Sequence, residues 1–577
     1  MSNKKTNVIL SEKINKLISI KITDSIPGCG VFVLHDGKII YKNEYGLANL
    51  TVNSQFSSKT SFYVASLAKQ FTGFCIALLL ERGKLNLEDD VRIYLADFPE
   101  FEQPIKIKHL VHHMSGLEEY IHVFFKLGYG VNQELDHYTD EDAWNIIIQQ
   151  TQLKFEPGSE YSYTNSNYFT LGKIIEVVTK QDFRSFVKEE LFEKLKMQNT
   201  FFLTSSNQKV PNNAIGYKKS SLNEFEIYTT LQSITAASGL ITTLEDFSKW
   251  EINFHNNQLG NDKSKINRTI LQNGKLNDGN MTNYGFGLML KKHYNLQHIM
   301  HAGQFASLAS VTHRFPDQKL SVVLFTNNGD LDYIGLGLEI ANLFLSDVLE
   351  IKFESEKQKE QVDSTQEKGN DKIILLSKEK VRRFEGLYRS MKSQLIVSFE
   401  ESNGKLLFFV PTREYEQVVY YPISESEFVL EEKRTLKLSP PPKIEFKINE
   451  NDESTIDLFF ISSEEVKSQY VKQQPESLTE ETIEDYTGCY YSKRLNATIT
   501  ILEKNQSLIF KNPLGKEISL YYVALNEFIK PFDKIMFNRN PQGKIVDFLI
   551  SSMFDNIQPN QNLGIRFEKL INFDQQN

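Results

Sequence analysis

Residues 66–80 read Ser66-Leu-Ala-Lys69-Gln-Phe-Thr-Gly-Phe-Cys-Ile-Ala-Leu-Leu-Leu80, a run that is apolar on nearly every side. Such a pattern predicts a buried helix rather than a surface one. Residues three positions apart share one face of a helix, so the Ser66 hydroxyl and the Lys69 amine can touch. Burial disfavours the charged form of an amine, and a neutral Lys69 could accept the Ser66 proton. The segment therefore predicts an activated serine.

The spacing of this pair is not specific by itself. Ser185/Lys188 and Ser377/Lys380 repeat it in a chain that is rich in both residue types. For an isolated match, a serine that caps a helix and a solvated lysine one turn later is the simpler interpretation. The choice between the two depends on the rest of the chain.

Two other segments supply that context. Tyr163 and Asn165 follow a Pro-Gly turn and precede an amphipathic helix, so a phenol and an amide would project together from a loop. His301-Ala-Gly303-Gln304 leads into a strand, where the glycine permits close backbone approach and the next N–H can face a ligand. Taken singly, such residues more often serve as a buried tyrosine, a capping asparagine and a turn before a strand.

Together the segments match three motifs of one enzyme superfamily in order and spacing: Ser-x-x-Lys, Tyr-x-Asn and Lys/His-x-Gly. The motifs fall on Ser66/Lys69, Tyr163/Asn165 and His301/Gly303. Residues 112–117, 236–246 and 284–287 also resemble segments of this superfamily, and the resemblance covers about residues 26–349. The chain thus resembles the serine β-lactamase and penicillin-binding-protein superfamily, in particular its class C-like branch with DD-peptidases, esterases and D-aminopeptidases.

The resemblance implies a β-lactamase/transpeptidase-like α/β (α+β) domain, in which helices flank an antiparallel sheet. It also implies a mechanism in which Ser66 attacks a carbonyl, Lys69 and Tyr163 share the proton transfers, and the acyl-enzyme is then hydrolysed. The backbone N–H groups of Ser66 and Gln304 would form the oxyanion hole. His301 would set the polarity opposite Tyr163.

The resemblance assigns the substrate side of the site to Asn165, His301, Gly303 and Gln304, with Asn165 orienting the substrate amide. Family members often continue after this third motif with another glycine and Pro-Gly-Phe; residues 304–308 lose those glycines, so a differently shaped loop is expected. His301 is mostly neutral at pH 7, where a lysine would be a permanent cation able to hold a carboxylate. We therefore expect a shift from penicillin-like or DD-carboxypeptidase substrates towards free-amine peptides, amides or esters.

The predicted function is that of a serine hydrolase, D-aminopeptidase-like or DD-peptidase-like, that acts through an acyl-enzyme on peptide, amide or ester bonds. A carboxylesterase or a β-lactamase of the same fold is the alternative within this class. A catalytically inactive binding or assembly module stays open as well, because membership of a superfamily does not guarantee chemistry. The substrate would be a small molecule or a short peptide, and no cofactor is expected.

Strands are expected at both ends of the first domain, residues 1–350. A hairpin is predicted at 30–41, and two further strands at 307–314 and 320–326 precede a last helix at 333–349. The middle of the domain is helical in its pattern. One sheet assembled from both ends of the domain is the simplest fold that fits this order.

The second half of the chain is β-rich and contains a repeat. The composition of residues 351–374 predicts a charged linker. Beyond it, residues 376–390 recur as 478–492, which indicates two copies of one domain, at 375–475 and 476–577. Their short strand-like runs predict two all-β, barrel-like (lipocalin-like) domains, similar in layout to the paired β-barrels that trail some D-aminopeptidase-like proteins.

Composition limits the partners. The 577 residues are 40% hydrophobic and 24% charged, which is typical of folded proteins, and the net charge of −9 disfavours nucleic acid as a partner. The longest aliphatic run, residues 74–80, is far below the roughly 20 residues of a membrane span. The N-terminus lacks a signal-peptide pattern and the three cysteines are scattered, which predicts a cytoplasmic location. A homo-oligomer stays open as a role for the β repeats.

A metal site is the last alternative. His109, His112 and His113 can share a helix face, which is the arrangement of some zinc ligands. No His-Glu-x-x-His motif accompanies them, and the segment matches a turn of the resembled family. We therefore expect these histidines to be structural and no metal to be bound.

Overall fold

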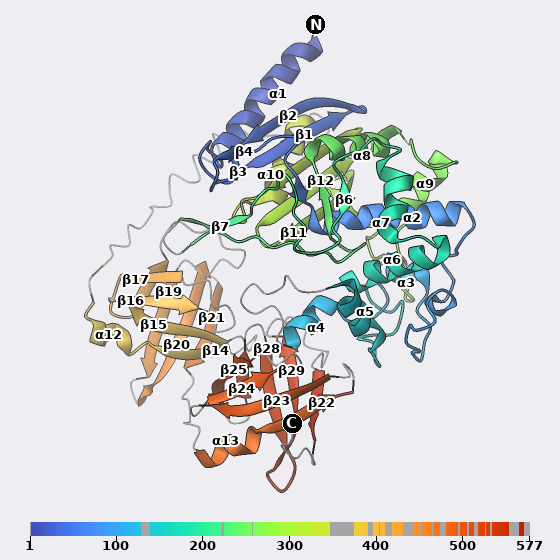
Figure 1. Ribbon diagram of the computed structural model, residues 1–577. Coiled ribbons are helices and arrows are strands. Elements are labelled where there is room, and N and C mark those ends of the chain that lie inside the picture. Colours follow the sequence, from blue (N-terminus) through green and yellow to red (C-terminus); the bar gives the residue numbers. More distant parts are fainter. Residues whose placement is uncertain are drawn as a thin grey trace. The chain divides into compact units, whose positions relative to one another are not determined.

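The computed structural model describes residues 2–127, 139–220, 224–256 and 258–346, and in the C-terminal half residues 374, 376–390, 396–402, 404–409, 418–430, 443–449, 452–463, 466–472, 480–493, 497–504, 507–512, 517–524, 527–530, 533–552 and 565–570 (Figure 1). The predicted linker, apart from Ile374, lies outside these residues. The chain divides into two compact units, the first made of Met1–Val123 and Asn132–Lys352, the second of Phe124–Val131 and Phe353–Asn577.

The first unit is built on a six-stranded antiparallel sheet with the order β10-β11-β12-β13-β1-β2. Its strands are β1 Cys29–His35, β2 Lys38–Tyr45, β10 Met289–His293, β11 Leu296–Phe305, β12 Leu308–Phe315 and β13 Leu320–Thr326. Because β1 pairs with β13, the two ends of the domain meet in the middle of the sheet, as the sequence predicts.

The predicted hairpin between β1 and β2 is confirmed, and its turn has a clear cause. Asp36 and Gly37 have φ values of 50° and 73°. Positive φ at both central residues defines the type I′ turn, whose twist matches that of the flanking strands.

One face of the sheet packs against α1 (Ser2–Ser19) and α10 (Tyr333–Leu345). The core there contains Ile14 and Ile18 from α1, Leu336 and Ile340 from α10, and Val31 from β1. Each such side chain contributes about 2 kcal/mol when it is fully removed from water. The last helix therefore has its expected place, although it ends at Leu345 rather than at residue 349; residues 347–349 lie outside the described chain.

The opposite face carries α2 (Lys69–Glu81) and α8 (Leu244–Asn256). Arg314 of β12 is bound to both helices, by a buried ion pair to α8 and by a hydrogen bond to α2. Arg314 Nε donates to Glu251 Oε2 at 2.9 Å, and its Nη2 donates to Gln70 Oε1 at 2.6 Å. The indole of Trp250 donates to the same Gln70 oxygen at 2.8 Å. A buried charge that loses its partner costs several kcal/mol, so this network fixes α2 against the sheet.

The first unit contains further helices and several small strands. The helices are α3 Ile107–Val111, α5 Asp140–Ile148, α6 Asn165–Thr179, α7 Phe183–Val187, α9 Lys263–Ile270, the 3₁₀ turns η1 Ala65–Ala68 and η2 Val91–Ile93, and the π-helical turn η4 Lys188–Phe192. Helix α4, Tyr120–Lys126, begins in the first unit, and its residues from Phe124 on are assigned to the second. The small strands are β3 Leu47–Asn49, β4 Ser54–Gln55, β5 Phe62–Tyr63, β6 Phe201–Phe202, β7 Tyr217–Lys219, β8 Phe225–Ile227 and β9 Leu240–Thr242.

The second unit contains the predicted all-β repeats. Each opens with a short helix, α12 Lys378–Arg382 or α13 Glu480–Tyr486. The first repeat is a closed barrel of β14 Gly386–Ser390, β15 Ile396–Ser402, β16 Lys405–Phe409, β17 Val418–Pro422, β18 Glu427–Leu430, β19 Lys443–Asn449, β20 Asp452–Ser463 and β21 Val466–Lys472.

The second repeat is the other predicted all-β, barrel-like domain. It is a nine-stranded sheet of β22 Gly488–Ser492, β23 Ala497–Lys504, β24 Ser507–Lys511, β25 Glu517–Ser519, β26 Tyr521–Ala524, β27 Glu527–Lys530, β28 Asp533–Arg539, β29 Ile545–Ser552 and β30 Ile565–Lys569. Its edges are β25 and β26, so within the described ranges it is an open sheet rather than a closed barrel.

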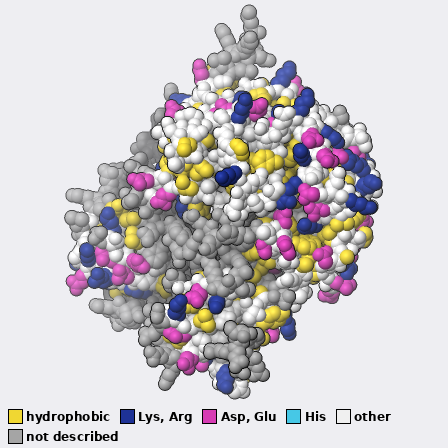
Figure 2. Space-filling model, viewed as in Figure 1, with side chains coloured by type: hydrophobic (Ala, Val, Ile, Leu, Met, Phe, Trp, Pro, Cys, Tyr) yellow, Lys and Arg dark blue, Asp and Glu magenta, His cyan; other side chains and the backbone are white. Residues whose placement is uncertain are grey.

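The surface charges are mixed in sign. On the face seen in Figure 2, acidic and basic side chains are interspersed. In the part of the chain that the structure describes, no helix has both the length and the apolar character needed to cross a bilayer.

Candidate active site

Ser66 lies in a strained turn rather than in the regular helix that the sequence predicts. It belongs to the 3₁₀ turn η1, and α2 begins only at Lys69. Ala65, directly before it, has a φ of 46°. A left-handed conformation costs an ordinary residue about 1–2 kcal/mol, and such strain is concentrated at functional sites.

Gly303 allows β11 to lie directly against this turn. A Cβ atom at Gly303 would come within 2.1 Å of Val64 O and 3.0 Å of Ser66 N. The Ser310 hydroxyl of β12 donates to the same Val64 oxygen at 3.0 Å. Only a glycine fits here, which explains the close backbone approach predicted from the sequence.

The Lys69 amine is fully buried and donates three hydrogen bonds. Its acceptors are Ser66 Oγ at 3.1 Å, Asn165 Oδ1 at 2.5 Å and the carbonyl oxygen of Ala237 at 2.8 Å. Thr72, one turn along α2, donates to the neighbouring Ala236 carbonyl at 2.7 Å. The 236–246 segment therefore supplies backbone acceptors that hold the amine beside the hydroxyl.

Burial gives this amine a second property. Desolvation lowers the pKa of Lys69 to about 7, against the opposing effect of the Glu119 charge. A large fraction of the amine is thus neutral near pH 7, and a neutral amine 3.1 Å from a hydroxyl can accept its proton. The chemistry predicted from Ser-x-x-Lys is available in this geometry.

Tyr163 joins the pair from the loop before α6. Its ring centre lies 5.0 Å from Lys69 Nζ. Burial raises the pKa of its phenol, and a side-chain hydrogen bond with Ser66 acts in the opposite direction. The hydroxyl, the amine and the phenol therefore meet at one place, although 97 positions separate Ser66 from Tyr163 in the sequence.

Asn165 is the first residue of α6 rather than part of the loop, because the Thr164 hydroxyl caps the helix by accepting from Ser166 N at 3.2 Å. Its Nδ2 and its backbone N both donate to Glu119 Oε2, at 3.0 and 2.5 Å. Sequence reasoning missed Glu119. Its signal was a pair of carboxylates, Glu118 and Glu119, directly after residues 112–117, at positions that the fold buries.

His301 lies within β11, whereas the sequence predicts that its motif precedes a strand. The ring donates from Nδ1 to the carbonyl oxygen of Ala302 at 2.8 Å, so Nε2 is the acceptor for the Tyr284 hydroxyl at 2.9 Å. Burial, followed by the charge of Lys69, lowers the pKa of His301 to about 3. The ring is therefore neutral, and both nitrogens are bound within the protein.

Gln304 is exposed one residue beyond Gly303, and β11 runs on to Phe305 before turning into β12. The turn has Ala306 at a φ of 49°, and Phe305 faces Leu308 across it. Residues 304–308, which lack the glycines that family members often have at this place, therefore form a tight hairpin. The Phe305 ring lies 6.0 Å from that of Tyr63.

The three histidines at 109–113 each have a separate protein partner. His109 Nδ1 accepts from Lys106 N at 3.1 Å, and His112 Nδ1 contacts the Tyr284 carbonyl oxygen at 2.9 Å. His113 Nδ1 accepts from Thr164 N at 3.3 Å, and its ring centre lies 4.4 Å from that of Tyr163. This histidine supports the loop that carries Tyr163.

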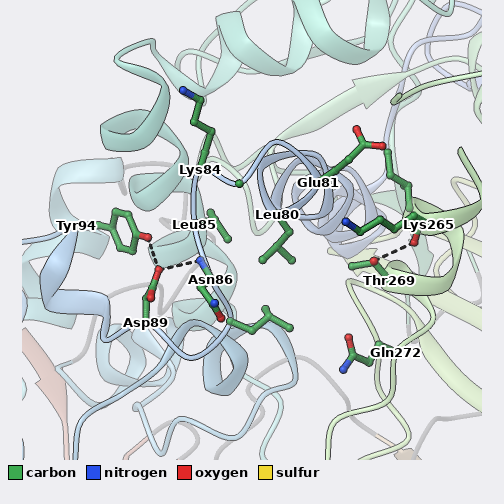
Figure 3. A pocket seen from close by; sticks show the side chains of 13 residues that line it. Leu80, Glu81, Lys84, Leu85, Asn86, Asp89, Tyr94, Lys265, Thr269 and Gln272 are labelled. Carbon is green, nitrogen blue, oxygen red and sulfur yellow. Dashed lines mark hydrogen bonds between the residues drawn. The ribbon is translucent and has the colours of Figure 1, made fainter. Parts of the chain in front are cut away.

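A cavity of about 580 Å³ lies at the other end of α2 (Figure 3). Its lining includes Leu80, Leu85, Lys84 and Lys265, and in the same place Tyr94 and Asn86 N both donate to Asp89. A helix rises 1.5 Å per residue, so the cavity is about 16 Å along α2 from Lys69. None of the predicted site residues lines it.

Comparison with known proteins places the chain in a family. The chain is 27% identical over 304 residues to a D-aminopeptidase of Gluconobacter oxydans, a match that covers 52% of this chain and 56% of that protein. It is also 27% identical over 328 residues to protein flp of Staphylococcus aureus, covering 55% of this chain and 63% of the relative. The chain thus spans a little over half the length of these relatives.

Among solved structures, the octameric penicillin-binding protein homologue from Pyrococcus abyssi superposes with a TM-score of 0.51 at 21% identity. That likeness covers 82% of this chain and 100% of the other, and it concerns the fold alone. The Beta-lactamase family model matches residues 14–334. Since that match takes in more than half of the residues, the chain belongs to the Beta-lactamase family.

Proposed function

We propose that this protein is a serine hydrolase that cleaves peptide, amide or ester bonds through an acyl-enzyme on Ser66. Lys69 takes the Ser66 proton during attack, and Tyr163 shares the transfers to the leaving group and from the incoming water. The backbone N–H groups of Ser66 and Gln304 stabilise the tetrahedral oxyanion, each worth about 3 kcal/mol in such sites. Asn165 orients the substrate amide.

One observation supports the proposal above all others: a fully buried lysine amine lies 3.1 Å from a serine hydroxyl. Burying an amine beside a hydroxyl is costly unless the amine gains partners, and here Asn165 and Ala237 provide them. The arrangement favours an enzyme over an inactive binding module.

The state of His301 supports a preference for substrates without a terminal carboxylate. Its pKa near 3 leaves no positive charge at pH 7, and its nitrogens are occupied by Ala302 and Tyr284. The relative named as a D-aminopeptidase points to free-amine peptides and amides. We therefore rank D-amino acid amides, short peptides and esters above penicillins and peptides ending in D-Ala-D-Ala.

The test is intact-mass detection of a covalent adduct across a panel of D-amino acid amides, short esters, β-lactams and D-Ala-D-Ala peptides. Amides or esters should give adducts and turnover, and Ser66→Ala should give neither. This variant should stay folded, because removing a small polar side chain costs at most about 1 kcal/mol. Near-native turnover by Ser66→Ala would refute the nucleophile, and faster β-lactam hydrolysis would refute the substrate preference.

Self-association is a separate part of the proposal. The Pyrococcus abyssi homologue is octameric, and its likeness extends beyond the residues that the family model matches. We propose that this chain also forms a homo-oligomer. Light scattering after size-exclusion chromatography tests this, and a mass of one chain at micromolar concentration would contradict it.

A further inference from the structure

Glu119 is a buried carboxylate next to the predicted machinery. Its side chain is 6% exposed, so it is shielded from solvent. Its Oε2 accepts from both the backbone N and the Nδ2 of Asn165, and its Oε1 accepts from Ile121 N at 3.2 Å. Both carboxylate oxygens are thus fixed by N–H donors.

These contacts determine the orientation of the Asn165 amide. An ionised carboxylate can only accept hydrogen bonds, so the amide must turn its Nδ2 towards Glu119. Its Oδ1 then faces the Lys69 amine, at 2.5 Å. With the amide reversed, two donors would face each other at Lys69 and two acceptors at Glu119.

The position of Glu119 is itself fixed by Ser166 on α6. The Ser166 hydroxyl donates to Glu118 O at 2.5 Å and accepts from Tyr120 N at 3.1 Å. The backbone on both sides of Glu119 is therefore held by the helix that begins with Asn165. These bonds fix the Glu119 backbone beside the start of α6, within reach of the Asn165 amide.

We propose that Glu119 is a positioning residue for proton transfer at Ser66: it fixes the Asn165 amide and, by its charge, sets the pH range in which Lys69 works. The proposal rests on the serine-hydrolase function given above. Glu119 does not touch the reacting atoms; it acts through Asn165 and through its electric field.

The charges around Lys69 single out Glu119. Tyr163 and Tyr168 face the amine with their rings, and burial raises the pKa of both phenols, so they are neutral. His113 and His301 are also neutral, because burial lowers their pKa values. Within the described residues, the charge that opposes the desolvation of Lys69 is that of Glu119.

The test is the pH profile of kcat/KM for Glu119→Gln on a neutral p-nitrophenyl ester. Glutamine can place its Oε1 where Oε2 was and keep both bonds to Asn165. Its Nε2 then faces the Ile121 N–H and loses that bond, so the substitution removes the charge and one hydrogen bond outside the contact with Asn165. Without that charge the pKa of Lys69 falls further, and the rising limb of the profile should move to lower pH by about one unit. Glu118→Gln is the control, because Glu118 is the neighbouring residue and is also buried. The rising limb of its pH profile should stay at the wild-type pH.

A second variant covers the case in which Glu119→Gln does not fold. Glu119→Asp keeps the charge but withdraws it from Asn165, so its limb should stay near the wild-type pH while kcat falls about tenfold. An unmoved limb in Glu119→Gln, or a wild-type kcat in Glu119→Asp, would overturn the inference.

The outcome for Glu119 can be told apart from that for the proposed function. If the wild-type protein forms no adduct on Ser66, the serine-hydrolase function itself fails. If the adduct forms and kcat/KM rises over the same pH range in the wild-type protein and in Glu119→Gln, the serine-hydrolase function stands. The proposed role of Glu119 then fails. Thermal unfolding of each variant shows that the rates refer to folded protein.

Discussion

The two units of this molecule both place a lysine beside a tyrosine, but with different consequences. In the first unit, Lys69 Nζ lies 5.0 Å from the centre of the Tyr163 ring. In the repeats, Lys472 lies 5.9 Å from the Tyr388 ring and Lys569 5.6 Å from that of Tyr490. Burial lowers the pKa of all three lysines.

The partners of the amines make the difference. Lys472 and Lys569 donate to backbone carbonyl oxygens, of Arg383 and Asp485, both at 2.8 Å. Lys69 has a serine hydroxyl among its acceptors and is fully buried. A lysine with a lowered pKa beside a tyrosine is thus a structural device in the repeats. In the first unit the added serine hydroxyl makes the same pair a candidate for chemistry.

The strongest test of this contrast is the same substitution in both units. Lys69→Ala should lower ester or amide turnover by about 10³-fold or more, because the proton acceptor of Ser66 is lost. Lys472→Ala is the matched control and should keep turnover within about twofold. Steady-state kinetics on purified, folded variants measure both, and equal losses would show that the contrast is false.

The tyrosines allow a finer comparison. Tyr163→Phe removes only a hydroxyl from the loop and should lower turnover by about 10²-fold, the usual contribution of a general acid–base group. Tyr388→Phe removes a hydroxyl that donates to Phe384 O at 3.0 Å. Its expected effect is a loss of about 1 kcal/mol in the free energy of unfolding, with turnover unchanged. A Tyr163→Phe enzyme with wild-type kcat would assign Tyr163 to structure.

The pH dependence gives a smaller effect. If a neutral Lys69 is required, kcat/KM should rise with pH through about 7, where the amine loses its proton. One unit below the pKa only about a tenth of the amine is neutral, so activity at pH 6 should be about tenfold below its plateau. Lys472→Ala should leave this limb in place. A flat profile between pH 5 and 8 would mean that the proton acceptor is another group.

The sequence could predict those features that local patterns encode. The hairpin turn at Asp36-Gly37 needs positive φ, and both residue types tolerate it. The three motifs predict which side chains to look for, and the repeat predicts two related domains. Family order then links Ser66 to Tyr163, a pairing that spacing alone does not contain.

The parts that escaped prediction depend on contacts between distant segments. Glu119 meets Asn165 only because Ser166 holds the two backbones together. Tyr284 lies in a segment that resembles the family, but nothing in the sequence indicates that its hydroxyl meets His301. The left-handed Ala65 carries no sequence signal, because alanine is not a residue that favours that conformation.

The last expected effect is on stability and concerns the glycine of the repeated Gly-x-Tyr pattern. Gly386 has a φ of 126°, and a Cβ there would lie 3.1 Å from Cε of Lys472. That neighbour is the end of a flexible side chain and can move, so the cost of Gly386→Ala comes from backbone strain and should be about 1–2 kcal/mol. Denaturant unfolding of the full chain measures it. Turnover should not change, because this glycine serves the structural lysine–tyrosine pair; a loss of turnover in a folded Gly386→Ala protein would connect the repeat to catalysis and end the separation between the two pairs.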